Sequence, residues 1–296
     1  MRVAMTGSSG MVGTALGASL ERDGHEVLRM RRGLRPDPSA VWNPAEGWIR
    51  EGALEGCDAV VNLAGASIGE GRWTASRKAL LRSSRIDSTR LLVDHLGRLA
   101  SRPGVLVSAS AVGYYGDRGD DLLDEDEPPG SGFLATLARD WESEALRATE
   151  LGVRTILIRS GLILSTTGGA LPRLLLPFKF GLGGRLGSGK QWSPWIALAD
   201  HVAAIRHLLA SDVAGPVNLV APEQVTNRDF TRAVGGALGR PTPLPAPAFA
   251  LRLALGQMAD ELLLDSQRVS SERLQHAGYQ FTHPRLAGAF EAVLAA

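Results

Sequence analysis

Apolar positions along the chain follow two patterns, one typical of strands and one typical of helices. The run RVAM at 2–5 is apolar, and from Val12 to Leu20 apolar residues recur every fourth position, as on one helix face. After a stop at Gly24, the run HEVLRM at 25–30 predicts a second strand. The chain therefore opens with a predicted strand, glycine turn, helix and strand.

The same alternation continues beyond this opening. Further strands are predicted at 57–66, 104–116, 153–164 and 215–222, and helices at 73–99, 133–152, 201–211 and 227–238, the last capped by Thr226. Strands that alternate with helices indicate a parallel sheet with helices on both faces. We therefore predict the α/β class, with a Rossmann-type doubly wound parallel sheet and a smaller, mainly helical C-terminal substrate domain.

A change in amino-acid composition sets the predicted domain boundaries. After Ser160 the chain becomes rich in glycine and proline until about residue 195. We assign 1–160, continued by about 197–220, to a dinucleotide-binding domain. The segments 161–196 and 221–296 are assigned to the substrate side.

The glycine turn has the spacing of a dinucleotide-binding loop. Gly7 permits the tight turn, Gly10 lets backbone approach a pyrophosphate, and Gly13 lets the helix pack closely on the sheet. The diphosphate would lie on free N–H groups at the positive helix end. A glycine turn without a ligand is the alternative. The cofactor contacts predicted here are Gly7, Ser9, Gly10, Met11 and Val12.

The end of the second strand indicates which dinucleotide fits. An acidic residue there would bind the ribose 2′-hydroxyl, whereas cations accept a 2′-phosphate. No carboxylate lies between Val27 and Arg35, and Arg31 and Arg32 end the strand. Their forked guanidinium groups favour NADP. The alternative is that these arginines form only a solvated strand edge.

Two further strands end in residues suited to a ligand. The strand at 57–66 runs into Leu63, Ala64 and Gly65, small residues that would let backbone lie against the adenosine half of a cofactor. The strand at 104–116 runs into Ser110, Tyr114 and Tyr115 at the carboxyl edge, where open parallel sheets bind their ligands. These last three residues are the catalytic candidates.

Composition and charge exclude several functions. The 32 Lys and Arg residues nearly balance the 31 Asp and Glu residues, so no overall field favours nucleic acid or an anionic membrane. The single Cys57 excludes an internal disulfide and a cysteine-cluster metal site, and the acidic segment 120–130 lacks metal-ligand spacing. We assign no metal. With no signal segment and no long uncharged apolar run, we expect a cytoplasmic protein.

Longer phrases carry a family resemblance. The segments TGSSGMVG, NLAG, SASAVGYYG and IRSGLIL resemble, in order, the extended short-chain dehydrogenase/reductase superfamily. Three longer segments are similar to the atypical, NADP-binding epimerase-family proteins of this superfamily, which are often labelled sugar-nucleotide epimerases or cell-division inhibitors. These segments are NLAGASIGEGRWTASRKALLRSSRIDSTRLL, LLLPFKFGLGGRLGSGKQWSPWIALADHV and GYQFTHPRL. The resemblance spans nearly the whole chain.

The superfamily's usual catalytic residues are only partly present. The resemblance implies a serine, matched by Ser110, and a Tyr-x-x-x-Lys pair at the start of a helix, where lysine lowers the pKa of the tyrosine. The helix expected from about Phe133 contains neither tyrosine nor lysine through residue 152. Tyr114 or Tyr115 is then either the replacement acid or an aromatic wall against the nicotinamide.

Polar residues of the second half offer fewer indications. Lys190, Gln191 and Trp192 line either a substrate cleft or an ordinary inter-domain loop. We expect His201 to be a surface or capping residue, while Ala197 stands where the family phrase WIH has histidine. The predicted helix at 73–99 is rich in cations, and we expect a solvated face from Arg77, Lys78, Arg82, Arg85 and Arg90.

The expected function is an NADP-dependent oxidoreductase or epimerase-like enzyme acting on a small carbonyl, alcohol or sugar-like substrate. The alternative is a non-catalytic NADP-binding regulator or redox sensor, which the missing Tyr-x-x-x-Lys pair favours. A sugar epimerase that cycles tightly held NAD is disfavoured by Arg31 and Arg32. We expect a small-molecule partner and neither nucleic acid nor membrane.

Overall fold

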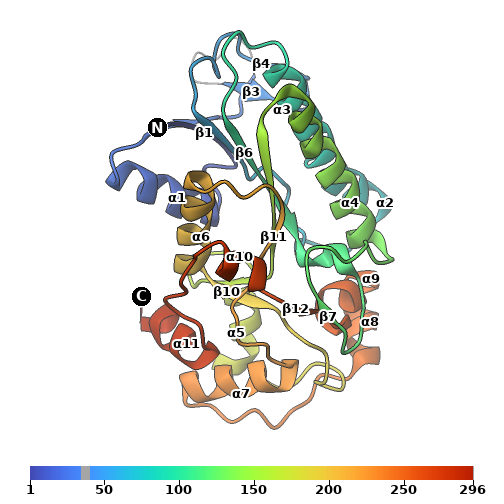
Figure 1. Cartoon of the computed structure of the whole chain (residues 1–296). Helices are drawn as coiled ribbons and strands as arrows, with labels where there is room; N and C mark the ends of the chain where they lie inside the picture. The colour runs from blue at the N-terminus through green and yellow to red at the C-terminus, as the bar shows by residue number, and fades with distance from the viewer. Residues whose placement is uncertain (35–40, 296) are drawn as a thin grey trace.

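A six-stranded, all-parallel sheet forms the centre of the molecule (Figure 1). The computed structural model describes residues 1–34 and 41–295. The spatial order is β11–β8–β6–β5–β1–β2, with bounds β1 Arg2–Thr6, β2 Glu26–Arg29, β5 Ala59–Asn62, β6 Val105–Ala111, β8 Arg154–Ser160 and β11 Gly215–Leu219. The strand order reverses between β1 and β5, where doubly wound sheets bind ligands. The predicted Rossmann-type sheet is confirmed.

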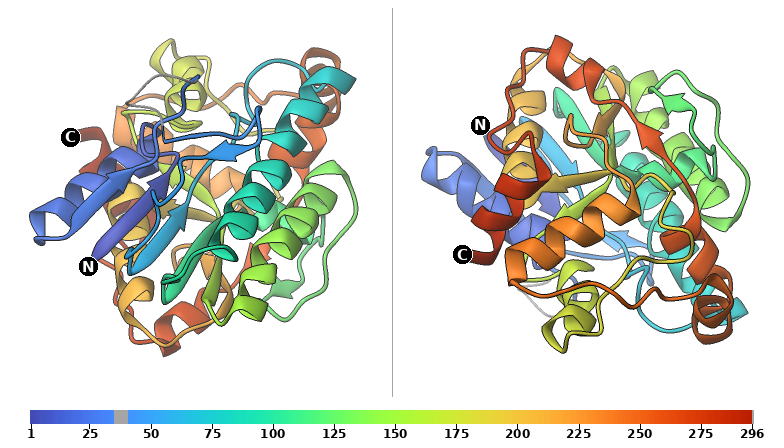
Figure 2. Two further views of the ribbon diagram at one scale, coloured as in Figure 1. Left: turned by 90° about the horizontal axis from the view of Figure 1, so that it is seen from above. Right: turned by 90° about the horizontal axis from the view of Figure 1, so that it is seen from below.

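Helices cover both faces of this sheet (Figures 1 and 2). Side chains alternate along each strand, so Val3 and Met5 face one core while Ala4 faces the other. The first core is covered by α1 (Met11–Arg22) and α6 (Leu198–Ala210), the second by α3 (Ile86–Leu96) and the turn η2 (Arg147–Leu151) after α4 (Phe133–Leu146).

The predicted helix at 73–99 is broken. It forms α2 (Ala75–Ser83) and α3, and the break lies at Ser84 and Arg85. The Ser84 hydroxyl accepts from the Ala66 N–H at 3.0 Å and donates to the Leu81 carbonyl at 3.2 Å. Serine hydroxyls that bond nearby backbone compete with the helical ladder. The loop after β5 is thereby fastened to the break.

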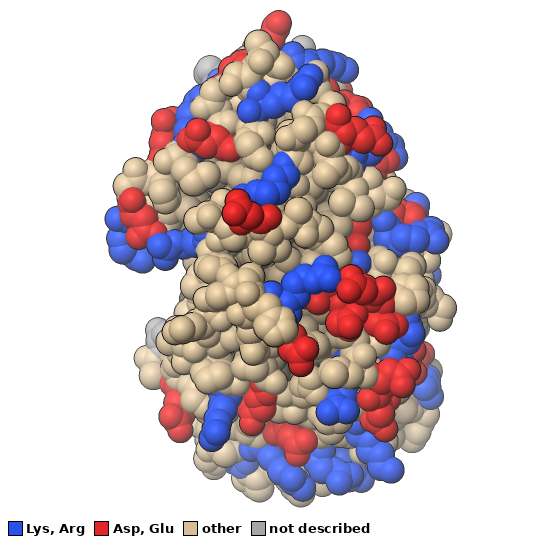
Figure 3. Space-filling model, in the orientation of Figure 1, with Lys and Arg blue, Asp and Glu red and all other residues tan. Residues whose placement is uncertain are grey.

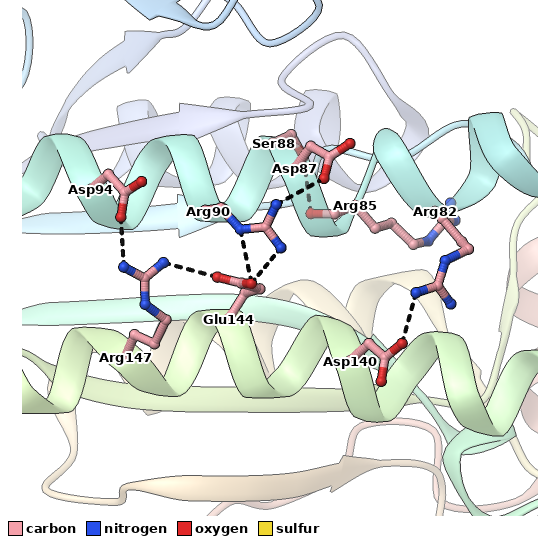
Figure 4. A network of polar contacts seen from close by, with 9 residues as sticks. All are labelled: Arg82, Arg85, Asp87, Ser88, Arg90, Asp94, Asp140, Glu144 and Arg147. Carbon is pink, nitrogen blue, oxygen red and sulfur yellow. Dashed lines mark hydrogen bonds and ion pairs between the residues drawn. The ribbon is translucent and has the colours of Figure 1, made fainter.

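The expected solvated cationic face is correct for Arg82 and Arg90, which are exposed, and wrong for Arg85, which is buried (Figure 4). Arg82 and Arg90 project from the α2–α3 segment toward α4, where they pair with Asp140 at 2.9 Å and Glu144 at 2.6 Å. Arg85 turns inward instead and donates to the Ala66 carbonyl at 3.0 Å. Burial lowers the pKa of Arg85 to about 10. The exposed arginines thus join the α2–α3 segment to α4 by ion pairs.

The predicted strand at 153–164 is divided at Gly161. A Cβ at Gly161 would lie 2.7 Å from the Pro194 carbonyl oxygen, so the close approach of that segment requires glycine. Beyond it, β9 (Leu162–Leu164) leaves the main sheet and pairs with β10 (Trp195–Ala197). A separate core beneath this pair contains Phe178, Trp195, Phe230 and Phe290.

The remaining elements are short or belong to the second half. They are β3 Trp42–Asn43, β4 Trp48–Ile49, η1 Val112–Tyr115, β7 Leu122–Leu123, α5 Leu171–Lys179, α7 Asn227–Leu238, α8 Ala248–Leu255, α9 Gln257–Ala259, the π-helical turn η3 Asp260–Leu264, β12 Arg268–Val269, α10 Glu272–His276 and α11 Leu286–Ala295. No helix within the described residues is long and apolar enough to cross a membrane.

Candidate active site

The glycine turn brings three backbone segments together. Gly7 has a φ of +64°, and a Cβ there would lie 2.5 Å from the Leu63 carbonyl oxygen. A Cβ at Gly13 would lie 2.2 Å from the Gly7 carbonyl oxygen. A Cβ at Gly10 meets only that oxygen, at 3.3 Å, among described atoms other than its chain neighbours. Gly7 and Gly13 are therefore required by packing, whereas a Cβ at Gly10 would make one tight contact, with the Gly7 carbonyl oxygen.

The first turn of α1 is an uncapped helix N-terminus. Gly10 is its N-cap, no side chain caps it, and its first turn has no acidic residue. Ser9 is exposed, while Met11 and Val12 are half-buried. Free N–H groups and the helix dipole make such an end suitable for a diphosphate. Gly168 packs on Met11, so the substrate-side segment reaches this turn.

A buried polar pair fixes the floor between β1 and β5. The Thr6 hydroxyl donates to Asn62 Oδ1 at 2.7 Å and accepts from the N–H groups of Leu63 and Ala64 at 3.1 and 3.2 Å. The backbone from Leu63 to Gly65 is thereby held beside the glycine turn. Sequence reasoning did not single out Thr6, although it ends the strand next to the one that Asn62 ends.

Two arginines follow β2 and have no side-chain partner among the described residues. Arg31 and Arg32 are exposed, and neither makes a side-chain hydrogen bond or ion pair with a residue that the structure describes. Arg29 on the same strand, in contrast, donates to Glu21 at 2.9 Å. Arg31 and Arg32 thus lie at the carboxyl end of β2, the strand that pairs with β1.

The hydroxyl of Ser110 points to a buried ion pair. It donates to Glu142 Oε1 at 2.5 Å, and Arg159 donates to both oxygens of that carboxylate at 2.9 Å. Arg159 and Glu142 are 3% and 5% exposed, so the bidentate pair neutralises charge that burial would otherwise penalise. Because its proton is bound by Glu142, Ser110 can accept but not donate a hydrogen bond at the sheet edge.

The two adjacent tyrosines differ in surroundings. Tyr115 is fully buried, and its hydroxyl donates to Asn218 Oδ1 at 2.7 Å while accepting from Arg159 at 3.0 Å. Burial raises the pKa of Tyr115 to about 12, against the effect of Arg159. Tyr114 is half-buried, its ring is covered by Arg159 at 3.6 Å, and its hydroxyl bonds no described residue. Only Tyr114 is therefore accessible.

The helix expected to bear the Tyr-x-x-x-Lys pair begins at Phe133. Glu261 caps it from the far end of the chain, accepting from the N–H groups of Phe133 and Leu134 at 3.0 and 2.7 Å. The Phe133 ring packs edge-on against Trp73 at 5.2 Å. The start of α4 is thus an apolar contact joined to the C-terminal region.

His201 lies in the interior, so the expectation of a surface or capping residue is wrong. It is 2% exposed, because the buried face of α6 carries it under the sheet. Its Nε2 lies 2.8 Å from the hydroxyl oxygen of Ser160, the last residue of β8, and its Nδ1 has no partner among described residues. Burial lowers the pKa of His201 to about 4, so the ring is neutral at pH 7.

Ser160 is a site residue that sequence reasoning missed. It is half-buried, and its Cα pairs with Ala111, one residue beyond Ser110. A neutral ring carries one proton, and leaving a buried N–H unpaired costs more than leaving an acceptor unpaired. The favoured tautomer therefore donates from Nε2 to Ser160, whose own proton can point toward the edge.

The predicted substrate residues do not converge. The Gln191 amide donates to the carbonyls of Leu186 at 3.1 Å and Leu263 at 2.9 Å, whereas Trp192 Nε1 donates to Asp120 at 2.8 Å. Lys190 is exposed. Gln191 and Trp192 thus fasten their loop to other segments. No group of His, Cys, Asp and Glu in the part of the chain described by the structure is placed to hold a metal ion.

Family models match two segments of the chain. The model of the NAD dependent epimerase/dehydratase family matches residues 3–220. A domain of unknown function, DUF1731, matches residues 246–293.

Several known proteins match nearly the whole chain. The epimerase family protein Mb2239 of Mycobacterium bovis is 46% identical over 285 residues, covering 95% of this chain and 93% of that protein. The crystal structure of the human epimerase family protein SDR39U1 with NADPH has a TM-score of 0.90 and 36% identity, covering 100% and 99% of the two chains. A nucleoside-diphosphate sugar epimerase from Corynebacterium glutamicum has a TM-score of 0.81 and 34% identity, covering 99% of this chain and 58% of that one.

Proposed function

This chain belongs to the NAD-dependent epimerase/dehydratase family, and we propose that it is an NADP(H)-dependent oxidoreductase or epimerase-like enzyme. Its substrate is a small carbonyl, alcohol or sugar-like molecule. The observation that carries the cofactor preference is that Arg31 and Arg32, at the carboxyl end of the strand beside β1, have no side-chain partner among the described residues. The human relative crystallised with NADPH supports the same preference.

We call the glycine turn, the N-terminus of α1 and the carboxyl ends of β1 and β5 the cradle. The residues of this cradle fit a dinucleotide phosphate. The N-terminus of α1 offers unpaired N–H groups to the diphosphate, and the absent side chain of Gly10 leaves room for it. Arg31 and Arg32 can donate to a 2′-phosphate without first breaking an ion pair to a described residue. When bound, the nicotinamide supplies or accepts hydride.

Chemistry at the sheet edge requires a proton donor near the substrate oxygen. Tyr114 has a hydroxyl proton that no described side chain takes, and Ser160 has one in the His201 tautomer that donates from Nε2. The protons of Ser110 and Tyr115 are bound internally. We assign proton donation to Tyr114, and hydrogen-bond acceptance from an alcohol to Ser110. These roles replace the missing Tyr-x-x-x-Lys pair.

A non-catalytic NADP-binding regulator is the second candidate. The start of α4 favours it, because Phe133 is packed on Trp73 and no lysine follows that could lower a tyrosine pKa. In that case the cofactor would bind without turnover. A screen of carbonyl compounds with NADPH, followed by loss of nicotinamide absorbance, distinguishes the two candidates.

Replacement of both arginines tests the cofactor assignment. Arg31→Ala/Arg32→Ala should weaken NADPH by about 2–4 kcal/mol, roughly 30- to 1000-fold, because charge-assisted bonds to the 2′-phosphate are lost. NADH affinity should change little. Calorimetric titration measures both, with Arg139→Ala, an exposed arginine on α4, as control. Equal losses for NADPH and NADH would contradict the assignment.

A further inference from the structure

A positively charged cavity lies on the outer side of α7, apart from the cofactor cradle. Its volume is about 450 Å³, within the range of small-molecule sites, and its lining is Arg185, Arg228, Thr231, Arg232, Thr242, Pro243 and Pro245. Figure 3 shows Lys and Arg side chains gathered along the lower edge of the molecule, over α7 and the loop that follows it. The cradle is formed by β1, β5 and α1, and none of these elements lines the cavity.

Two of the three guanidinium groups that line the cavity have no counter-ion among the described residues. Arg185 and Arg228 make no side-chain hydrogen bond or ion pair with a residue that the structure describes. Arg232 faces one carboxylate, Asp229, at 3.5 Å, and the other oxygen of that carboxylate accepts from Thr226. Because α7 is already capped by Thr226 and Asp229, its N-terminus does not supply the site. The charge comes from side chains.

The walls of the cavity are fixed by close backbone packing. A Cβ at Gly184 would lie 1.7 Å from the Leu244 carbonyl oxygen, and one at Gly235 would lie 2.6 Å from Thr242. The Ala246 N–H donates to the Arg185 carbonyl at 2.9 Å. The loop from 240 to 246 is thus held against both α7 and the segment at Arg185. A pre-formed cavity loses little entropy when a ligand binds.

We propose that this cavity is a second binding site, for a small molecule that carries a phosphate group. Guanidinium forks match phosphate geometry, and the Thr231 and Thr242 hydroxyls are suited to its remaining oxygens. An uncharged ligand would leave Arg185 and Arg228 without a counter-ion among the described residues, whereas a phosphate dianion supplies one. The polar lining and the two prolines suit a phosphorylated sugar better than a hydrocarbon.

The site is joined to the loop of the predicted substrate residues. The Arg228 N–H donates to the Gly189 carbonyl at 2.9 Å, and the Asn227 N–H donates to the Gln191 carbonyl at 2.8 Å. Asn227 Oδ1 also accepts from the Leu186 N–H at 2.8 Å. A ligand held by Arg185 and Arg228 would therefore contact one residue next to this loop in the sequence and one residue hydrogen-bonded to it.

Titration with two probes tests the proposal on the full chain saturated with NADPH, so that the cradle does not compete. Inorganic phosphate and ribose 5-phosphate are titrated at 150 mM chloride by calorimetry and NMR. Saturable binding of ribose 5-phosphate is expected, and Arg185→Ala/Arg228→Ala should weaken it by roughly 30-fold or more. Phosphate that binds as tightly as the ester would assign the site to the free ion, within the same chemistry.

A second double variant that removes the same number of positive charges elsewhere shows whether binding depends on contacts in the cavity or on the net charge of the protein. Arg139→Ala/Arg252→Ala removes two exposed arginines that pair with Asp140 and Asp260, and should leave ribose 5-phosphate binding unchanged. If the cavity variant unfolds, Arg228→Lys keeps the charge but loses the fork, and should still weaken binding. The proposal is overturned by no saturable binding, by equal losses in both double variants, or by binding of an oligonucleotide but not of the sugar phosphate.

Discussion

Ser160 Oγ lies 2.8 Å from His201 Nε2, so a hydroxyl at the open end of β8 is bonded to a ring enclosed in the core. Arg159, one residue earlier, is bonded to Glu142 on the opposite helix layer. Consecutive residues of one strand are thus fixed from the two faces of the sheet. The carboxyl edge is held by buried polar contacts on both sides.

The buried imidazole makes stability dependent on pH. Burial lowers the pKa of His201 to about 4, whereas the unfolded chain takes up the proton near pH 6.5. The stability contributed by the neutral ring is therefore full above pH 6.5 and is lost as pH falls toward 4. His201→Leu should show a smaller drop in urea midpoint between pH 7 and pH 4.5 than the natural protein. An equal drop in both proteins would contradict this assignment.

Substitutions at two glycines of the turn should have different effects, one on NADPH binding and the other on the stability of the fold. Gly10→Val should abolish NADPH binding and leave the circular dichroism spectrum intact, because its side chain lies beside the helix end, where its Cβ meets a single backbone oxygen at 3.3 Å. Gly13→Ala should instead destabilise the fold by more than about 3 kcal/mol, since its Cβ would meet the backbone of Gly7. Calorimetric titration and urea unfolding measure the two effects. Unaltered NADPH affinity in Gly10→Val would remove this turn from the site.

The two tyrosines should respond differently to loss of the hydroxyl. Tyr114→Phe should lower turnover of a carbonyl found in the screen by about 10²–10⁴-fold with little change in stability. Tyr115→Phe should cost about 1–3 kcal/mol of stability, because it leaves Asn218 Oδ1 without its buried donor. Steady-state kinetics and urea unfolding of both variants separate the roles. Full turnover in Tyr114→Phe would exclude it as the acid.

A buried carboxylate, Glu142, and a half-buried one, Glu144, lie on α4 and form a matched pair. Glu142→Gln should destabilise the protein by about 3–5 kcal/mol, because Arg159 would remain charged and buried without its partner. Glu144→Gln, which loosens surface pairs with Arg90 and Arg147, should cost about 1 kcal/mol or less. Urea unfolding at pH 7 compares them, and equal costs would show that Arg159 finds another counter-ion.

The sequence alone determined the order of elements and the ligand-binding end of the sheet. The spacing of Gly7, Gly10 and Gly13 and the strand-helix alternation are local patterns, because a backbone turn and a 3.6-residue period depend on near neighbours. The same holds for the position of Arg31 and Arg32 after the second strand. The resemblance of the longer sequence segments likewise identified the family that the comparisons confirm.

Only the tertiary structure decided which polar groups of that edge are free to act. Ser110 and Glu142 are 32 residues apart, and Ser160 and His201 are 41 apart, so no local pattern pairs them. Each pairing depends on how a helix packs across the sheet and on which protons burial leaves available. Tyr114 and Tyr115 are neighbours in the sequence, yet one hydroxyl is enclosed and the other is not, because the 3₁₀ turn η1 directs them to different surroundings.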